Sequence, residues 1–371
     1  MALDAWLTIL QAAQGEQRDW FDALEKLGSP QALVAESARG LAALGMSEDA
    51  IRRLKSPDEA VLTRWRRWLG KPQRAIVGFG SEGYPQLLAN TPDAPLALWL
   101  EGAEQTLLRA PQLAIVGSRS PTSAGRDTAQ RFAQYLSELG LTITSGLATG
   151  IDGASHRGAL KGVGKTVAVL GSGLDIIFPR AHEGLARQIA ENGLLISEYA
   201  PGVTPRKFHF PQRNRIIAGI TVGTLVVEAT RRSGSLITAR RAGDYGREVF
   251  AIPGSIHNPL ARGCHALIRQ GAKLVEEAGD ILVELAPLLQ IDLTAIRVTA
   301  ESEKPPSTLD DPVYADVLKN VDFAPTTIAE LMERAGLTAA ELSSMLLVLE
   351  LEGFVEALPG GRYSRLAKGI S

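Results

Sequence analysis

Residues 113–153 open with Leu113-Ala-Ile-Val-Gly-Ser-Arg119 and close with Leu141-Thr-Ile-Thr-Ser-Gly-Leu-Ala-Thr-Gly-Ile-Asp-Gly153. Each of these stretches is a short apolar or β-branched run that ends in a loop of small residues. The residues between them, 124–139, have helical spacing. Apolar runs joined by helices are typical of parallel strands that are covered on both faces. This stretch therefore predicts a Rossmann-like, doubly wound parallel sheet of the α/β class.

The same alternation continues along the chain and sets the limits of the predicted sheet domain at 73–292. A second helix is expected at 183–191. Two further runs, 74–78 and 97–100, are candidates for edge strands. The clearest predicted strands are 113–116, 141–144, 166–170, 194–196, 224–227, 249–252 and 273–275.

The residues on either side of this domain have other patterns. Residues 1–72 read as short helices, which predicts a small helical domain, similar to a SAM or helix-hairpin-helix domain, that acts as a bundle or cap rather than as a dedicated binding module. Residues 293–311 are polar and contain prolines, which is typical of a linker. Residues 312–371 suggest three helices and a hairpin, because Leu342, Met345, Leu346 and Leu349 share one helical face. This is the pattern of a winged-helix domain.

The composition is that of an ordinary globular protein. The 371 residues are 45% hydrophobic and 22% charged, with a net charge of −2, so the chain has room for two or three domains. The single cysteine, Cys264, excludes an internal disulfide and a multi-thiolate zinc site. The five histidines are scattered, so we expect no metal and also no cofactor. Because no membrane span or secretory signal is seen, we expect no membrane partner and a reducing cytoplasm.

Small residues gather where the predicted strands end. Loops of this kind expose backbone N–H groups at helix N-termini, where a phosphate is stabilised. The alternative is that the glycines only make tight strand–helix turns. The candidate phosphate-binding residues are Gly117, Ser118, Arg119, Gly146, Thr149, Gly150, Gly171, Ser172 and Gly173.

Positive charge is concentrated in residues 201–250, which hold nine basic and three acidic residues. Phe208 and Phe210 are interleaved with this charge, and in an extended segment both rings would share one face. Basic groups beside aromatic rings suit a single-stranded nucleic acid, which needs neutralised phosphates and stacked bases. A solvated helix face beside a core phenylalanine is the equally good alternative. The basic residues are Arg206, Lys207, Arg213, Arg215, Arg231, Arg232, Arg240, Arg241 and Arg247.

Asp152 and His156 lie four residues apart at the start of a predicted helix. They could form an acid/base pair of an enzyme. We favour a structural role, in which Asp152 binds loop amides and His156 packs against the sheet. No phosphate-binding lysine motif is found, because the glycine-rich run 162–166 leads into a strand instead of a helix.

Several of these motifs, in this order, resemble the DNA-processing protein A family (DprA, also called Smf). The similar stretches are Ile115–Arg119, Ser145–Asp152 with His156, Phe210–Gly219, Glu228-Ala229 and Arg232–Thr238. The resemblance covers roughly residues 75–290, and the flanking helical and winged-helix segments fit the long form of the family.

The resemblance implies a recombination mediator of natural transformation. Such proteins bind and protect incoming single-stranded DNA and load the RecA recombinase, with single-strand-binding protein as a further partner; they dimerise through the Rossmann-like domain and are not expected to be enzymes. The implied pocket residues are Arg119, Lys207, Phe210 and either Arg231 or Arg232. The motifs add Arg213, Asn214, Arg215, Ser233, Gly234 and Ser235 to the candidate DNA-binding residues.

The predicted winged helix has an unusual charge. Residues 312–371 carry eight acidic and five basic residues, and the expected recognition helix, 338–352, has no Lys or Arg. A helix that reads a DNA groove needs such donors. We therefore expect this domain to contact a protein, or to bind duplex DNA weakly through Arg362, Arg365 and Lys368.

A nucleotide-processing enzyme is the main alternative function. Gly223-Thr224 and Glu228 resemble part of the motif of nucleoside-monophosphate phosphoribohydrolases, which have a similar sheet. Here the preceding residues, Gly219-Ile-Thr221, replace the Pro-Gly-Gly of that motif, and the spacing to the glutamate is one residue too long. The phosphate-binding turn is therefore incomplete. A nucleotide-sensing or scaffold protein is a second alternative.

Overall fold

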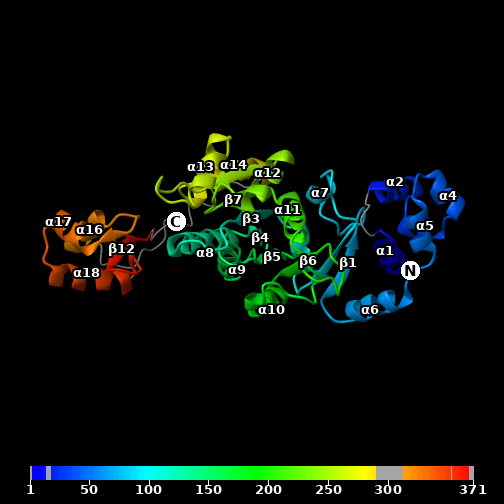
Figure 1. Cartoon of the computed structure of the whole chain (residues 1–371), viewed down its shortest axis with the longest axis horizontal. Coiled ribbons are helices and arrows are strands. Elements are labelled where there is room, and N and C mark those ends of the chain that lie inside the picture. Colours follow the sequence, from blue (N-terminus) through cyan, green and yellow to red (C-terminus); the bar gives the residue numbers. More distant parts are fainter. Residues whose placement is uncertain (1, 14–17, 290–311, 352, 367–371) are drawn as a thin grey trace. The chain divides into compact units, whose positions relative to one another are not determined.

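The computed structural model describes residues 2–13, 18–289, 312–351 and 353–366 (Figure 1). They form two compact units, one of residues 1–254 with 259–275 and the other of residues 255–258 with 276–371. The larger unit is built on a sheet with the strand order β1-β2-β6-β5-β4-β3-β7-β8-β9. The strands are β1 (Arg74–Gly78), β2 (Ala97–Glu101), β3 (Gln112–Val116), β4 (Thr142–Ser145), β5 (Thr166–Val169), β6 (Leu194–Ser197), β7 (Gly223–Val226), β8 (Glu248–Ala251) and β9 (Lys273–Leu274).

The strands from β3 to β9 are parallel, which confirms the predicted fold class. β1 and β2 are antiparallel additions, and only β1 lies at the edge of the sheet, because β2 pairs with β6 on one side and with β1 on the other. The expectation that 97–100 forms an edge strand was therefore wrong. The reason is that β1 pairs along the side of β2 that would otherwise be open.

Helices cover both faces of the sheet (Figure 1). Ile216, Leu236 and Leu267, one from each helix of the first face, pack against Val116, Val169 and Val226 of the strands. On the other face, Leu185 and Ile189 pack against Leu195. The first face has α11 (His209–Ile220), α12 (Ser235–Asp244) and α13 (Arg262–Arg269), and the other has α8 (Ser123–Glu138), α9 (Ile151–Ala159) and α10 (Glu183–Asn192). Short helices α7 (Gln86–Ala89), η1 (Gln105–Arg109) and η2 (Arg180–His182) connect these elements.

The N-terminal residues form short helices, as their spacing predicted. Ser29, Ser37, Ser47 and Asp58 cap successive helices with their side-chain oxygens, which satisfies amides that a helix leaves unpaired. Trp65 and Trp68 pack edge-on against Trp99 of β2, with ring centroids 5.4 and 5.7 Å apart. The helices are α1 (Ala2–Ala12), α2 (Arg18–Leu27), α3 (Pro30–Ala35), α4 (Ala38–Ala43), α5 (Glu48–Lys55) and α6 (Glu59–Leu69).

These helices therefore share apolar contacts with the sheet and belong to the same compact unit. The predicted boundary between a helical domain, 1–72, and a sheet domain, 73–292, stays a proposal. It marks the place where the chain changes from helices to strands. The expected linker at 293–311 lies outside the described residues.

The smaller unit contains the predicted winged helix. Its sheet has the order β10-β12-β11, and Leu331, Leu342, Leu346 and Leu349 are buried in its core. Gly336 ends α17 in the left-handed conformation, with φ 67°, as is common for a residue after a helix. The elements are α14 (Ala278–Leu289), α16 (Pro312–Asn320), β10 (Thr326–Thr327), α17 (Ile328–Ala335), α18 (Ala339–Leu351), β11 (Val355–Leu358) and β12 (Arg362–Arg365). The unit thus begins before the predicted limit at 292.

Candidate nucleic-acid interface

The chain reverses its winding direction at β3. From this strand it continues to β4 on one side, whereas β7 pairs on the other side, with Val116 opposite Val226. The loops that follow β3 and β7 therefore diverge and leave a crevice beyond the carboxyl ends of the strands, where ligands bind in open α/β sheets. A pocket of about 400 Å3 lies at this point.

The pocket gathers residues from loops that are far apart in sequence. Its lining contains nine of the predicted site residues, namely Gly117, Ser118, Arg119, Phe210, Arg213, Asn214, Ser233, Gly234 and Ser235. The Ser118 amide donates to the Glu228 carbonyl at 2.6 Å, which ties the two loops together. Asn214 Nδ2 donates to the Gly234 carbonyl at 3.3 Å, which ties the N-terminal half of α11 to the residue that precedes α12.

Arg119 and Phe210 combine a charge and a ring at the pocket. The Arg119 side chain is exposed, and its guanidinium carbon lies 5.7 Å from the centre of the half-buried Phe210 ring. Phe178, from the loop after β5, lies against the same ring at 5.5 Å between centroids, tilted by 40°. Phe178 is 47% exposed, so the pair presents an aromatic surface to solvent. A cation beside such rings suits both a phosphate and a base.

Phe208 and Phe210 do not share one face of an extended segment, so that expectation was wrong. Helix α11 begins at His209, and Phe208 is the residue before it. Pro211 lies in the first turn, where a helix tolerates the missing N–H group. Phe208 is 54% exposed and packs its edge on His209 with the centroids 4.6 Å apart. The helical turn therefore separates the two rings.

Arg213 is buried and is held by the protein itself. Its Nη1 donates to the carbonyls of Gly146 and Val169. Burial lowers the pKa of Arg213 to about 10, although nearby Asp152 counteracts this shift. A Cβ atom at Gly146 would lie 2.5 Å from the guanidinium, so this glycine makes room for the arginine. The charge of Arg213 is thus balanced by Asp152, whereas that of Arg119 faces solvent.

Asp152 and His156 have the structural roles that we favoured. Asp152 Oδ2 accepts from the amides of Gly146 at 3.2 Å and Ala148 at 3.3 Å. His156 Nε2 accepts from the Leu147 amide at 3.3 Å, so its proton is on Nδ1, which lies 2.7 Å from Thr166 Oγ1. Burial lowers the pKa of His156 to about 3. Both side chains hold the loop after β4 in place.

Arg215 lies apart from the pocket. Its guanidinium forms an ion pair with Glu198 and donates to the Asp93 carbonyl, and both partners in the ion pair are largely buried. Burial raises the pKa of Glu198, and Arg215 opposes this rise. Arg215 therefore joins α11 to two other segments of the larger unit.

The other predicted residues do not line the pocket. Gly150 has φ 81°, and a Cβ atom there would lie 2.3 Å from the Ser118 carbonyl oxygen, so the turn requires glycine. Ser172 donates from Oγ to the Ile176 carbonyl at 2.7 Å. These contacts favour the tight-turn interpretation of their loops. Thr149, Lys207, Arg231 and Arg232 are exposed, while Gly171 and Gly173 are buried.

The structure also adds residues that the sequence did not single out. Phe178 is one of them, and Thr230, Ile237 and Thr238 line the pocket beside the predicted serines. Glu228, which the sequence motifs did contain, is buried, and its carboxylate accepts from the Thr122 amide at 2.9 Å and from Thr122 Oγ1 at 2.8 Å. In the sequence, Phe178 is an aromatic residue directly before Pro179. Its exposure to solvent, which makes it a candidate for stacking, cannot be read from the sequence.

Two features are absent from the described part of the chain. Among those residues no group of three or more His, Cys, Asp or Glu side chains is placed to hold a metal ion. None of the helices there has the length and hydropathy needed to cross a membrane.

Comparison with family models identifies two parts of the chain. Residues 75–286 match the family described as DNA recombination-mediator protein A, and residues 300–361 match the DprA winged helix domain. Protein Smf of Escherichia coli is 45% identical over 304 residues, which cover 81% of this chain and 80% of that protein. The DNA processing protein DprA of Streptococcus pneumoniae is 51% identical over 201 residues, covering 54% of this chain and 71% of that protein.

Solved structures show the same relationship. The structure of DprA from Streptococcus pneumoniae matches with a TM-score of 0.68 and 39% identity, over 76% of this chain and 97% of that one. A structure of DNA processing protein A from Helicobacter pylori, described for its single-stranded DNA binding mode, matches with a TM-score of 0.52 and 29% identity. That match covers 58% of this chain and 96% of the other.

Proposed function

The chain belongs to the DNA recombination-mediator protein A family, and on this basis we propose that it binds single-stranded DNA at the pocket between β3 and β7 and loads the RecA recombinase onto it. The observation that carries the DNA-binding part is the placement of exposed Arg119 beside the Phe210 and Phe178 rings. A guanidinium neutralises a phosphate, and a ring stacks on any base, so this pair would bind single strands with little sequence preference.

Lys207 and either Arg231 or Arg232 would extend the contact with phosphates. Lys207 is exposed two residues before α11, and both arginines are exposed just before Ser233, which lines the pocket. Helix α12 begins at the pocket, where Ser233 Oγ lies 2.7 Å from Ser235 Oγ, so these two hydroxyl groups are candidate contacts for a phosphate. We assign Ser233, Gly234 and Ser235 to this contact, with Gly117, Ser118 and Asn214 opposite them.

The protein would act without catalysis. The carboxylate of Glu228, which an enzyme of the phosphoribohydrolase type would use, is engaged by Thr122. Asp152 Oδ2 and His156 Nε2 likewise accept from backbone amides, and His156 Nδ1 is bonded to Thr166 Oγ1. These bonds support a role in shaping loops and count against the nucleotide-processing alternative.

We further propose a homodimer that forms through the larger unit and works in the cytoplasm with RecA and single-strand-binding protein. One pocket spans few nucleotides, and two pockets on one strand would raise affinity through effective concentration. Light scattering at working concentration tests this idea. A strictly monomeric mass together with undiminished DNA binding would contradict it.

A mobility-shift comparison of single- and double-stranded DNA tests the main proposal, with RecA-filament formation measured on the same single strands. We expect preference for single strands and faster RecA loading when the protein is present. A panel of nucleoside monophosphates, incubated with the protein and assayed for release of the base, tests the alternative enzyme function. Hydrolysis without binding to single strands would overturn the proposal.

A further inference from the structure

We propose that one flank of helix α6, carrying Arg64 and Arg67, continues the path of single-stranded DNA beyond the pocket. This inference rests on the proposed function and adds a second contact region to it. Residues 59–69 lie outside the segment that matches the family model, 75–286. The surface therefore comes from the N-terminal helices rather than from the sheet that matches the family model.

Helix α6 separates its basic residues into two flanks. Leu62, Trp65 and Trp68 are buried against the rest of the unit, and Arg64 and Arg67, three residues apart, share one exposed flank. Arg66 lies on the other flank, where its guanidinium pairs with Asp4 at 2.8 Å and Glu59 at 3.1 Å. Only the first flank keeps its charge available, since no ion pair of Arg64 or Arg67 is found among the described residues.

This flank adjoins the loop that leads to the pocket. Trp65 Nε1 donates to the Pro201 carbonyl at 3.3 Å, which fixes α6 to the loop after β6. A Cβ atom at Gly202 would lie 3.7 Å from the Arg64 guanidinium carbon, so the arginine rests on that glycine. The same loop continues through exposed Arg206 and Lys207 into α11, which bears Phe210.

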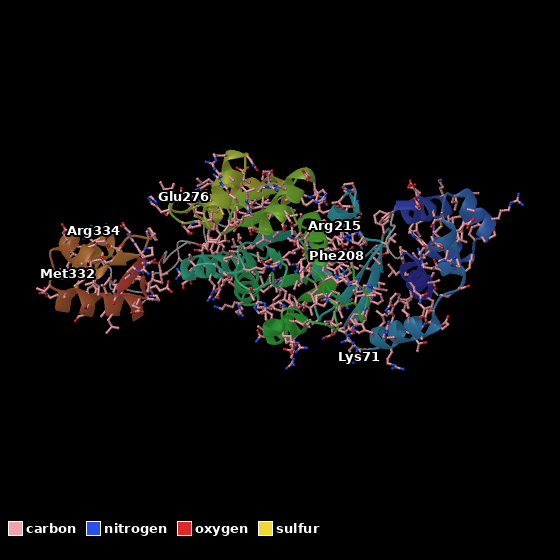
Figure 2. The ribbon with its side chains drawn as sticks, in the orientation of Figure 1. Lys71, Phe208, Arg215, Glu276, Met332 and Arg334 are labelled. Atoms are coloured by element: carbon pink, nitrogen blue, oxygen red, sulfur yellow. The ribbon has the colours of Figure 1, made fainter. Side chains whose placement is uncertain are left out.

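The loop is held in a fixed shape. The Gly173 amide donates to the Val203 carbonyl at 2.9 Å, and the Gly202 amide donates to Asp175 Oδ1 at 2.9 Å. The Asp175 carboxylate is thus bonded to the same glycine on which Arg64 rests. Lys71, labelled in Figure 2 with Phe208, follows α6 and is also exposed.

Along the chain, the exposed Arg206 and Lys207 lie between Gly202, which Arg64 contacts, and Phe210, which lies beside Arg119 at the pocket. A chain of phosphates is the ligand whose charge complements such a series, and the continuity with the pocket favours a single strand over a separate ligand. A short oligonucleotide would fill the pocket alone, whereas a longer one would also reach α6.

The test compares the full-length variant Arg64→Ala/Arg67→Ala with the matched control Arg39→Ala/Arg52→Ala. The control removes two exposed arginines from α4 and α5 and changes the net charge equally. Binding is measured by fluorescence anisotropy with oligothymidylates of about 6 and about 20 nucleotides, one near the lower end of the roughly 4–16 nucleotides that a single-strand-binding OB-fold covers and one beyond its upper end. Salt is varied for each, and the melting temperature of each variant is recorded.

We expect the α6 variant to bind the longer strand more weakly, with a slope of log K against log salt lower by about 1.4 for two lost phosphate contacts. Its binding to the shorter strand should match wild type, and Arg64→Lys/Arg67→Lys should restore the slope. Equal behaviour of the α6 variant and the control on the longer strand would overturn this inference. A different result would contradict the proposed function itself, namely that Arg119→Ala leaves binding of the shorter strand unchanged in the same assay.

Discussion

The guanidinium carbon of Arg119 lies 5.7 Å from the centre of the Phe210 ring, although the two residues come from the loop after β3 and from the start of α11. The parallel sheet brings them together, because both follow strands that end at the same edge. Charge and aromatic surface are therefore neighbours at one pocket, and each can be removed independently of the other.

Arg119→Ala and Lys207→Ala should each weaken binding to single-stranded DNA, whatever its base sequence. Each variant should lower the slope of log K against log salt by roughly 0.7, because one phosphate contact is lost. Titrations at several salt concentrations measure this slope, with Arg52→Ala as a control for an exposed arginine on α5. Wild-type slopes in both variants would place the phosphate contacts elsewhere.

Phe210→Ala should cost about 1–3 kcal/mol of binding free energy and leave the salt slope nearly unchanged, because a stacked ring carries no charge. Phe178→Ala should show the same pattern, since its ring extends the same surface. The melting temperature distinguishes stacking from packing. A large fall in melting temperature that accounts for the lost binding would show that the rings serve the fold alone.

Arg213→Ala should act mainly on stability. It would remove the hydrogen bonds to the Gly146 and Val169 carbonyls and the positive charge near the buried Asp152 carboxylate, and each buried polar group left without its partner costs about 1–3 kcal/mol. Urea unfolding measures the loss. The double variant Arg213→Ala/Asp152→Asn should recover part of it, because no buried charge remains. A stable single variant with weak DNA binding would instead make Arg213 a direct DNA ligand.

Stability should fall in acid because of His156. Its pKa is about 3 in the folded protein and 6.5 ordinarily, so between these values the unfolded chain binds more protons. Its contribution is therefore complete above pH 6.5 and is lost as the pH falls, by about 1.4 kcal/mol per pH unit. Urea unfolding from pH 7 to pH 4 measures this dependence. His156→Asn should be less stable at pH 7 but have a flatter profile, whereas the exposed His257→Asn should match wild type.

A chain that lacks residues 293–371 should keep most of its affinity for single-stranded DNA. The pocket residues all precede this segment, and the winged-helix residues 312–371 have more acidic than basic side chains. Anisotropy with the truncated and full-length proteins tests this, with circular dichroism to verify folding. Near-complete loss of binding by a folded truncation would show that the winged helix holds the strand.

The sequence by itself determined the alternation of strands and helices, the parallel sheet and the winged helix. These features follow from local periodicity: Leu342, Leu346 and Leu349 lie on one helical face and are buried together. The sequence also placed the small-residue loops and the basic stretch at the sheet edge, because parallel strands end on the same side. The loops containing Ser118 and Ser233 do meet at the pocket.

Only the tertiary structure decided which of the basic residues face solvent. Arg213 and Arg215 lie two residues apart in one motif, yet Arg213 bonds to buried carbonyls, Arg215 pairs with Glu198, and Arg119 from a distant loop is exposed. The sequence does not reveal these partners, because the groups that neutralise a buried charge come from other strands and loops. For the same reason, the contact of Arg64 with Gly202 and that of Phe178 with Phe210 became visible only when the segments were placed in space.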